Sequence, residues 1–245
     1  SSYQTSSRPL PSPASSPRPG VVRPLLCESP RGTAARSCHL TDTRPEVVAS
    51  EGSQLLSELK AIREKDSLRD TYGRHLFGQS CLMGRRMVEA GARFVTVLWD
   101  APDGYSWDSH RTSEHLEKHL VPGFDQAFSA LITDLEQRGL LDETLVVAVG
   151  EMGRTSKPDT KAWGRGHWSH CFPCVLAGAG VRGGITYGTS DAHAAYPKHH
   201  PVSPEDLAKT IYWALGINPD LMLPDQEGRP VPIIESGKPL TQLFG

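Results

Sequence analysis

The chain has 245 residues, a formal net charge of −2 and a hydrophobic content of 38%. This length suffices for one α/β domain with a core, and the near-neutral charge argues against nucleic acid or an acidic membrane surface as a partner. Because no apolar run approaches the roughly 18 residues that cross a bilayer, we expect no membrane span.

The first part of the chain differs in composition from the rest. Residues 1–45 are rich in Ser, Pro and Arg and have almost no apolar periodicity. Such a segment cannot bury enough apolar surface to offset the entropy lost on ordering. We therefore predict a disordered segment over residues 1–45 and a folded α/β region over residues 46–245. The first residues lack the apolar stretch of a secretory signal, and the sequence assigns no cellular location.

Apolar residues at helical spacing predict four helices. The first, over residues 45–65, is weak, and the second, over residues 67–91, ends at a glycine. The third covers residues 115–139 and is entered through a proline. The fourth covers residues 203–216, where Ser203 is a natural cap, followed by Pro204 in the first turn.

Runs rich in β-branched and aromatic residues predict strands between these helices. Residues 93–100 (RFVTVLWD) and 144–150 (TLVVAVG) have the composition of buried parallel strands. Residues 172–180 and a short run at 184–188 predict two more. The order of helices and strands favours an α/β sheet with helices on its faces.

The cysteines do not form a disulfide framework. The chain has five of them at scattered spacings, and Cys171 and Cys174 make the single CxxC pair. A zinc ribbon would need a second pair, and a thioredoxin-like motif would open a helix rather than a strand. We interpret both as ordinary cysteines of a strand, with a redox pair as the weaker alternative.

Polar side chains gather after two predicted strands, where open α/β sheets bind ligands. Asp108 and His110 follow the strand over residues 93–100, Glu151 follows the next one, and His167 closes a Gly/Arg-rich loop. This mixed nitrogen and oxygen set suits zinc, manganese or iron, whereas calcium suits imidazoles poorly. The pattern predicts a metal site.

Two arginines lie close to these candidates in the sequence. Arg154 and Arg165 could clamp a tetrahedral anion such as phosphate or sulfate. The residues alone leave an alternative open, because Asp-x-His in a polar loop is often a turn and an acid after a strand often caps the next turn. With 10 histidines in the chain, some also fall in loops by chance.

Several stretches resemble the bacterial family called "domain of unknown function 1501". They are YGRHLFGQSCLMGRRMVEAGARFVTV, WDSH, DLEQRGLLDETLVVAVGEMGRT, GRGHW, LAGAGVRGG, YGTSDAHAAYP and VSPEDLAKTIYWALGINPD. The resemblance runs from about residue 64 to the C-terminus. The family abounds in planctomycetes and is often placed with sulfatase-like proteins of the alkaline phosphatase superfamily. This implies an α/β fold of the alkaline phosphatase type, a mostly parallel sheet flanked by helices, truncated here on the N-terminal side.

The resemblance also implies a site and an activity. Asp108, His110 and His167 resemble the one Asp and two His that hold one metal in that superfamily. Glu151 would ligate or bridge toward a second metal, and Met152 stands where the superfamily has a histidine. Zinc or manganese is the expected ion, with calcium or magnesium less favoured. The implied substrate is a small sulfate or phosphate ester, whose anion the two arginines would steady.

The first 63 residues of the sequence depart from the pattern of the family. Neither the early Asp-bearing strand nor the nucleophile loop of the superfamily is found there, and the stretch looks unrelated to the family. We therefore expect the C-terminal portion of a metal-dependent hydrolase, impaired without its nucleophile half. The alternative is a degenerate, non-catalytic binding or structural module.

Overall fold

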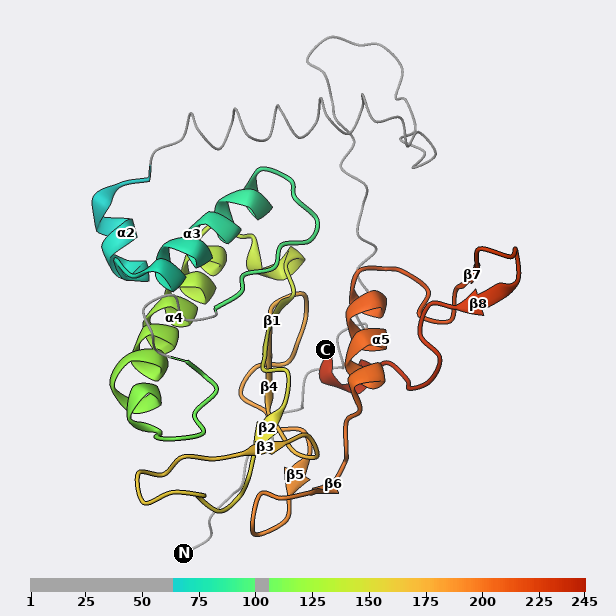
Figure 1. Cartoon of the computed structure of the whole chain (residues 1–245). Helices are drawn as coiled ribbons and strands as arrows, with labels where there is room; N and C mark the ends of the chain where they lie inside the picture. Colours follow the sequence, from blue (N-terminus) through green and yellow to red (C-terminus); the bar gives the residue numbers. More distant parts are fainter. Residues whose placement is uncertain (1–63, 100–105) are drawn as a thin grey trace, which may run out of the picture.

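The computed structural model describes residues 64–99 and 106–245 (Figure 1). The predicted disorder of residues 1–45, nearly all of the helix over 45–65 and the absent nucleophile motif lie outside the described residues. The helices, the small sheets and the loops that hold the candidate site are all within them.

Three helices form a layer on one side of the molecule, drawn in cyan and green in Figure 1. They are α2 (Asp66–Tyr72), α3 (Leu76–Glu89) and α4 (Val121–Gln137), with a π-helical turn η1 (Leu116–Leu120) leading directly into α4. The predictions of helices over residues 67–91 and 115–139 are thus confirmed in type, although the first is split into α2 and α3 around Gly73. Their facing sides bury one apolar cluster, made of Tyr72, Phe77, Cys81, Leu82, Ala127 and Ala130.

A buried arginine ties these three helices together. Arg85 of α3 is 1% exposed, and its Nε lies 2.8 Å from Oδ2 of Asp134 in α4. The same carboxylate oxygen accepts a hydrogen bond of 3.0 Å from the Tyr72 hydroxyl of α2. Burial, together with this carboxylate, raises the pKa of Tyr72. Arg85 also pairs with Glu64 and Glu89, so its charge is neutralised where an unpaired charge would be very costly.

The central strands are short and antiparallel. β1 (Val146–Val149) pairs with β4 (Cys174–Ala177), with Val146 opposite Ala177. Strands are therefore confirmed within residues 144–150 and 172–180, but they are only partly buried. Within the described ranges, every sheet consists of two antiparallel strands. The parallel sheet of the alkaline phosphatase type is not seen there and stays a prediction.

Two of the predicted strands do not form in the described residues. Residues 94–99 run without strand pairing, and Phe94 and Leu98 are 74% and 85% exposed. Residues 184–188 form no strand either, and the next one, β5 (Thr189–Ser190), begins directly after them. β-Branched composition favours an extended backbone, but a strand also needs a neighbour whose peptide groups pair with it.

The C-terminal part packs around one helix on the other side of the β1–β4 pair (Figure 1). α5 (Pro204–Ala214) confirms the helix predicted over residues 203–216. The remaining elements are short: η2 (Leu141–Glu143), β6 (Pro197–His199), which pairs with β5, the hairpin of β7 (Met222–Pro224) and β8 (Pro230–Pro232), and η3 (Thr241–Leu243). No helix of the described part is long and apolar enough to span a bilayer, as the hydropathy led us to expect.

A reciprocal cap begins α5. The Ser203 hydroxyl accepts from the Asp206 amide at 3.1 Å, and the Asp206 carboxylate accepts from the Ser203 amide at 2.9 Å. We expect Ser203→Ala to lower the free energy of unfolding by about 1 kcal/mol, because one amide of the first turn loses its partner. Urea denaturation measures this loss. Ser129→Ala, the same change on the exposed side of α4, is the control and should cost nothing measurable; equal losses in both variants would contradict the capping role.

Candidate metal centre

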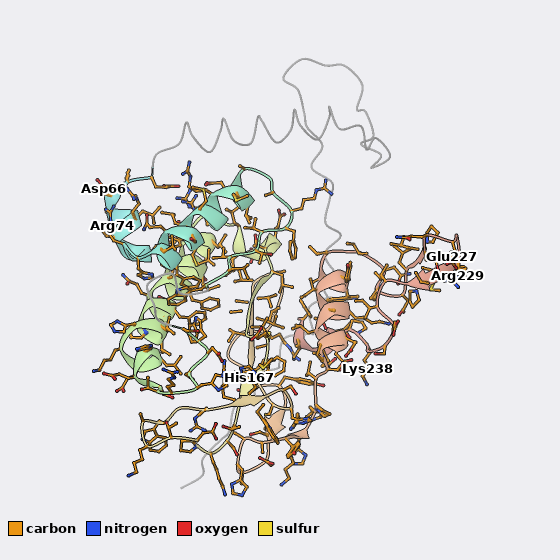
Figure 2. The ribbon with its side chains drawn as sticks, in the orientation of Figure 1. Asp66, Arg74, His167, Glu227, Arg229 and Lys238 are labelled. Carbon is orange, nitrogen blue, oxygen red and sulfur yellow. The ribbon has the colours of Figure 1, made fainter. Side chains whose placement is uncertain are left out.

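A two-residue strand pair presents two of the candidate residues. β2 (Gly153–Arg154) and β3 (His167–Trp168) pair antiparallel, with Arg154 directly opposite His167. Directly opposed residues in such a pair have side chains on the same face, so Arg154 and His167 point the same way. Trp168 points to the other face, where its indole N–H donates to the Ala195 carbonyl at 2.6 Å. Figure 2 shows His167 near the middle of the molecule.

The loop between β2 and β3 lies against the loop that contains Asp108 and His110. The Arg165 amide donates to the Ser109 carbonyl at 2.9 Å, and the Thr160 hydroxyl donates to the Arg111 carbonyl at 2.9 Å. Gly164 is required at this contact, because a Cβ there would lie 2.1 Å from the His110 carbonyl oxygen. Backbone contacts therefore hold the two loops together. The sequence had marked this loop as glycine-rich without showing which glycine makes the contact.

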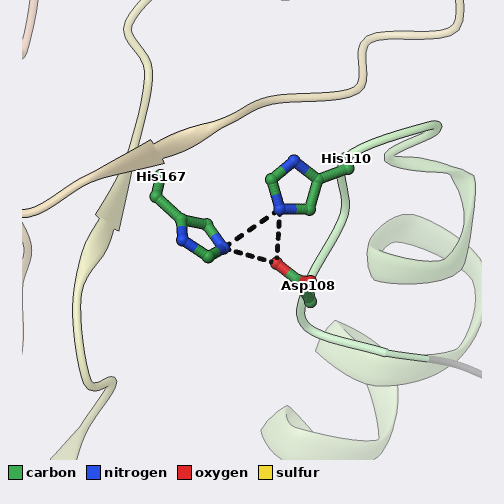
Figure 3. A group of neighbouring side chains, drawn as sticks. All are labelled: Asp108, His110 and His167. Atoms are coloured by element: carbon green, nitrogen blue, oxygen red, sulfur yellow. Dashed lines mark hydrogen bonds and ion pairs between the residues drawn. The ribbon is translucent and has the colours of Figure 1, made fainter.

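These contacts bring Asp108, His110 and His167 into one cluster (Figure 3). The Asp108 Oδ1 atom lies 2.9 Å from His167 Nε2 and 3.1 Å from His110 Nε2. The two Nε2 atoms are 3.0 Å apart. All three side chains are exposed, so the cluster is open to ligands from solvent.

Protons alone cannot satisfy all three of these contacts. An ionised carboxylate only accepts hydrogen bonds, and each Nε2 either carries a proton or accepts one. If both Nε2 atoms donate to Asp108, their N–H groups face each other across 3.0 Å. If one Nε2 accepts from the other, it has no proton left for the carboxylate. A cation facing the three lone pairs would satisfy every one of them.

Arg154 completes the surroundings of Asp108. Its Nη1 atom donates to Asp108 Oδ1 at 2.5 Å, the same oxygen that both histidines contact. Hydrogen bonds from His167 and from Arg154 lower the pKa of Asp108 to about 2. The carboxylate is therefore ionised, and able to ligate a cation, at any pH well above 2.

The other predicted site residues lie elsewhere. Glu151 is exposed and is not part of the cluster of potential ligands found in the described residues. Arg165 donates through Nη1 to the carbonyls of Thr155 and Ser156, at 2.6 and 2.7 Å, and so braces its own loop. The structure thus joins Arg154, but not Glu151 or Arg165, to Asp108 and the two histidines.

The CxxC pair is not disulfide-bonded. Cys174 lies in β4, as predicted, whereas the prediction is wrong for Cys171, which lies in the preceding loop. Desolvation of its sulfur raises the pKa of the Cys174 thiol, although the residue is exposed, and this disfavours the reactive thiolate at neutral pH. This weakens the redox interpretation of the pair.

Comparison with known proteins gives one match. Residues 35–244 match a family described as "Protein of unknown function (DUF1501)". No curated protein and no solved structure matches. The match begins at residue 35 rather than near residue 64, so the expectation that all of residues 1–63 are unrelated to the family is wrong. Because the match covers most of its length, the chain belongs to the DUF1501 family of proteins of unknown function.

Proposed function

We propose that Asp108, His110 and His167 hold one divalent metal ion. The observation that carries this proposal is the triangle of three ligand atoms that no arrangement of protons satisfies. Two atoms that bind one ion at about 2.1 Å lie roughly 3.0 to 3.4 Å apart, for angles at the metal between about 90° and 110°. The observed separations of 2.9 to 3.1 Å lie at or just below the lower end of this range, which corresponds to angles near 90° at the metal.

The ligand types favour a transition metal. Two imidazole nitrogens and one carboxylate oxygen suit zinc or manganese, whereas calcium and magnesium prefer oxygen ligands throughout. Three protein ligands also leave further positions for water or substrate, as catalytic metal sites do and closed structural sites do not.

The activity that we propose is hydrolysis of small sulfate or phosphate esters, in a domain of the alkaline phosphatase type. It rests on the resemblance to sulfatase-like proteins together with the open metal cluster. A bound metal would polarise the ester and lower the pKa of the attacking group. Arg154 orients the Asp108 carboxylate and provides positive charge beside it. No nucleophile is assigned among the described residues, so we expect slow turnover.

Hydrolysis of aryl phosphate and aryl sulfate esters tests this activity. With zinc or manganese added, we expect slow turnover that chelation removes and that Asp108→Ala abolishes. Asp125→Ala, which removes an exposed carboxylate from α4, is the matched control and should leave the rate unchanged. No turnover by a protein that has bound its metal would contradict the hydrolase.

A second candidate is a non-catalytic metal-binding module. Two observations favour it: Glu151 lies outside the cluster, and Arg165 is engaged by its own loop. Both residues would have served a second metal or the anion in a complete hydrolytic site. The same assay separates the candidates, because the module binds metal without hydrolysing either ester.

A further inference from the structure

At the proposed metal centre, the carboxylate oxygen Oδ1 of Asp108 is contacted by three side chains at once. Asp108 Oδ1 receives a hydrogen bond from Arg154 and also faces both histidine Nε2 atoms. A metal ligated by this oxygen would have to share it with a guanidinium. The guanidinium belongs to Arg154, whose positive charge is permanent, so it cannot yield to the metal by losing a proton.

We propose that Arg154 couples the binding of a metal ion and of a tetrahedral anion: it competes with the cation for Asp108 Oδ1, and it turns to the anion once the cation is bound. The inference rests on the proposed metal centre and adds to it a role for Arg154. The anion is a sulfate or phosphate group that lies beside the metal.

Distance accounts for the competition. Arg154 Nη1 is 2.5 Å from Asp108 Oδ1, and a metal would lie about 2.1 Å from the same oxygen. The two positive charges would then be separated by at most about 4.6 Å, the sum of these distances. Repulsion at that range weakens cation binding by roughly tenfold even when solvent screens it strongly.

The surroundings of Arg154 allow its side chain to turn. β2 fixes its backbone, but among the described residues its guanidinium is hydrogen-bonded only to Asp108. The side chain is 21% exposed, so part of it already faces solvent. Arg165 differs, because the carbonyls of Thr155 and Ser156 hold its guanidinium. Arg154 is therefore the arginine that can serve an anion next to the metal.

Coupling of this kind is reciprocal. If the metal releases Arg154 for the anion, the metal raises the affinity for the anion, and the anion raises the affinity for the metal by the same factor. A purely positioning role for Arg154 predicts the opposite change in metal affinity when the arginine is removed. If Arg154 only oriented Asp108 for the metal, its removal would weaken metal binding.

Calorimetric titration with zinc, in chloride buffer with and without sulfate, tests the coupling. For the wild type we expect sulfate to tighten zinc binding. For Arg154→Met, and likewise for Arg154→Gln, we expect zinc binding about tenfold tighter than in the wild type without sulfate, and no further effect of sulfate. Arg111→Met removes the same charge from the loop that carries Asp108 and should behave as the wild type.

The outcomes separate the two proposals. Zinc binding by Arg154→Met that is equal to or weaker than that of the wild type would overturn the coupling and leave the metal centre standing. The same holds for a sulfate effect that persists in both Arg154 variants. No zinc binding by either the wild type or the variants would overturn the metal centre, and the coupling with it.

Discussion

Replacing His167 by alanine is expected to lower the zinc affinity of the protein by at least about 100-fold. Loss of residues that merely support metal ligands costs 10- to 100-fold, so loss of a ligand should cost more. His167 Nε2 is one of three ligand atoms, and two remaining ligands hold a cation weakly. The result would identify the cluster as a metal site rather than a polar loop.

Equilibrium dialysis against zinc, followed by metal analysis, measures this effect. His170→Ala is the matched control, because His170 lies three residues away, is exposed and packs against Trp168 and Tyr196 instead. We expect His170→Ala to retain the zinc of the wild type. Equal metal content in the wild type and in His167→Ala would exclude the site.

Replacing Arg85 by methionine is expected to lower the free energy of unfolding by about 3 kcal/mol, the lower end of the range for a broken buried ion pair, because Arg138 still pairs with Asp134 and Glu89. Methionine keeps most of the volume but removes the cation that pairs with Asp134, Glu64 and Glu89. Asp134 is 6% exposed, so its carboxylate would remain buried with only the charge of Arg138 beside it, 2.7 Å from its other oxygen. The loss should exceed that expected of the capping variant at Ser203.

Urea denaturation compares this variant with Lys118→Met. Lys118 also pairs with a carboxylate, Glu114, at 2.6 Å, but both side chains are more than half exposed. Exposed pairs on a helix contribute only about 0.3–0.5 kcal/mol, so this control should be nearly as stable as the wild type. A loss below about 1 kcal/mol in Arg85→Met would show that the buried network contributes little.

The helices were predictable because their signals are local. The apolar spacing in α3 and α4 gives the face that packs, and Ser203 with Pro204 marks the first turn of α5. The ionic network around Arg85 was not predictable, since Arg85 and Asp134 lie far apart in the sequence. An arginine within a helical pattern usually indicates the solvated face.

The strands were predicted less well for a physical reason. A run such as residues 93–100 has the composition of a strand, but pairing depends on which other segment lies beside it. Residues 144–150 and 172–180 contain β1 and β4, which pair with each other, whereas the described residues supply no partner for 94–99. Composition also cannot distinguish a parallel from an antiparallel neighbour.

The candidate site was predicted in part. Asp108 and His110 are two residues apart, so their proximity is local, but His167 joins them only through the contacts between the two loops. Glu151 was selected because it follows a strand, yet the chain turns into β2 directly afterwards, and it is Arg154 of β2 that contacts the cluster, through Asp108. That Arg154 lies opposite His167 is a matter of strand register, which spacing in the sequence does not show.

This register separates two kinds of change in the β2–β3 ribbon. Insertions or deletions that spare the contacts of Thr160, Gly164 and Arg165 with the Asp108 loop would leave Arg154 opposite His167. A slip of one residue in the pairing would instead exchange the two faces, turning Trp168 toward Asp108 and His167 toward Ala195. Changes in loop length and slips in register should therefore have unequal consequences during evolution. Relatives that differ in loop length away from these contacts keep the three ligands. A relative whose pairing slips by one residue loses His167 from the site altogether, because no register lies halfway between the two.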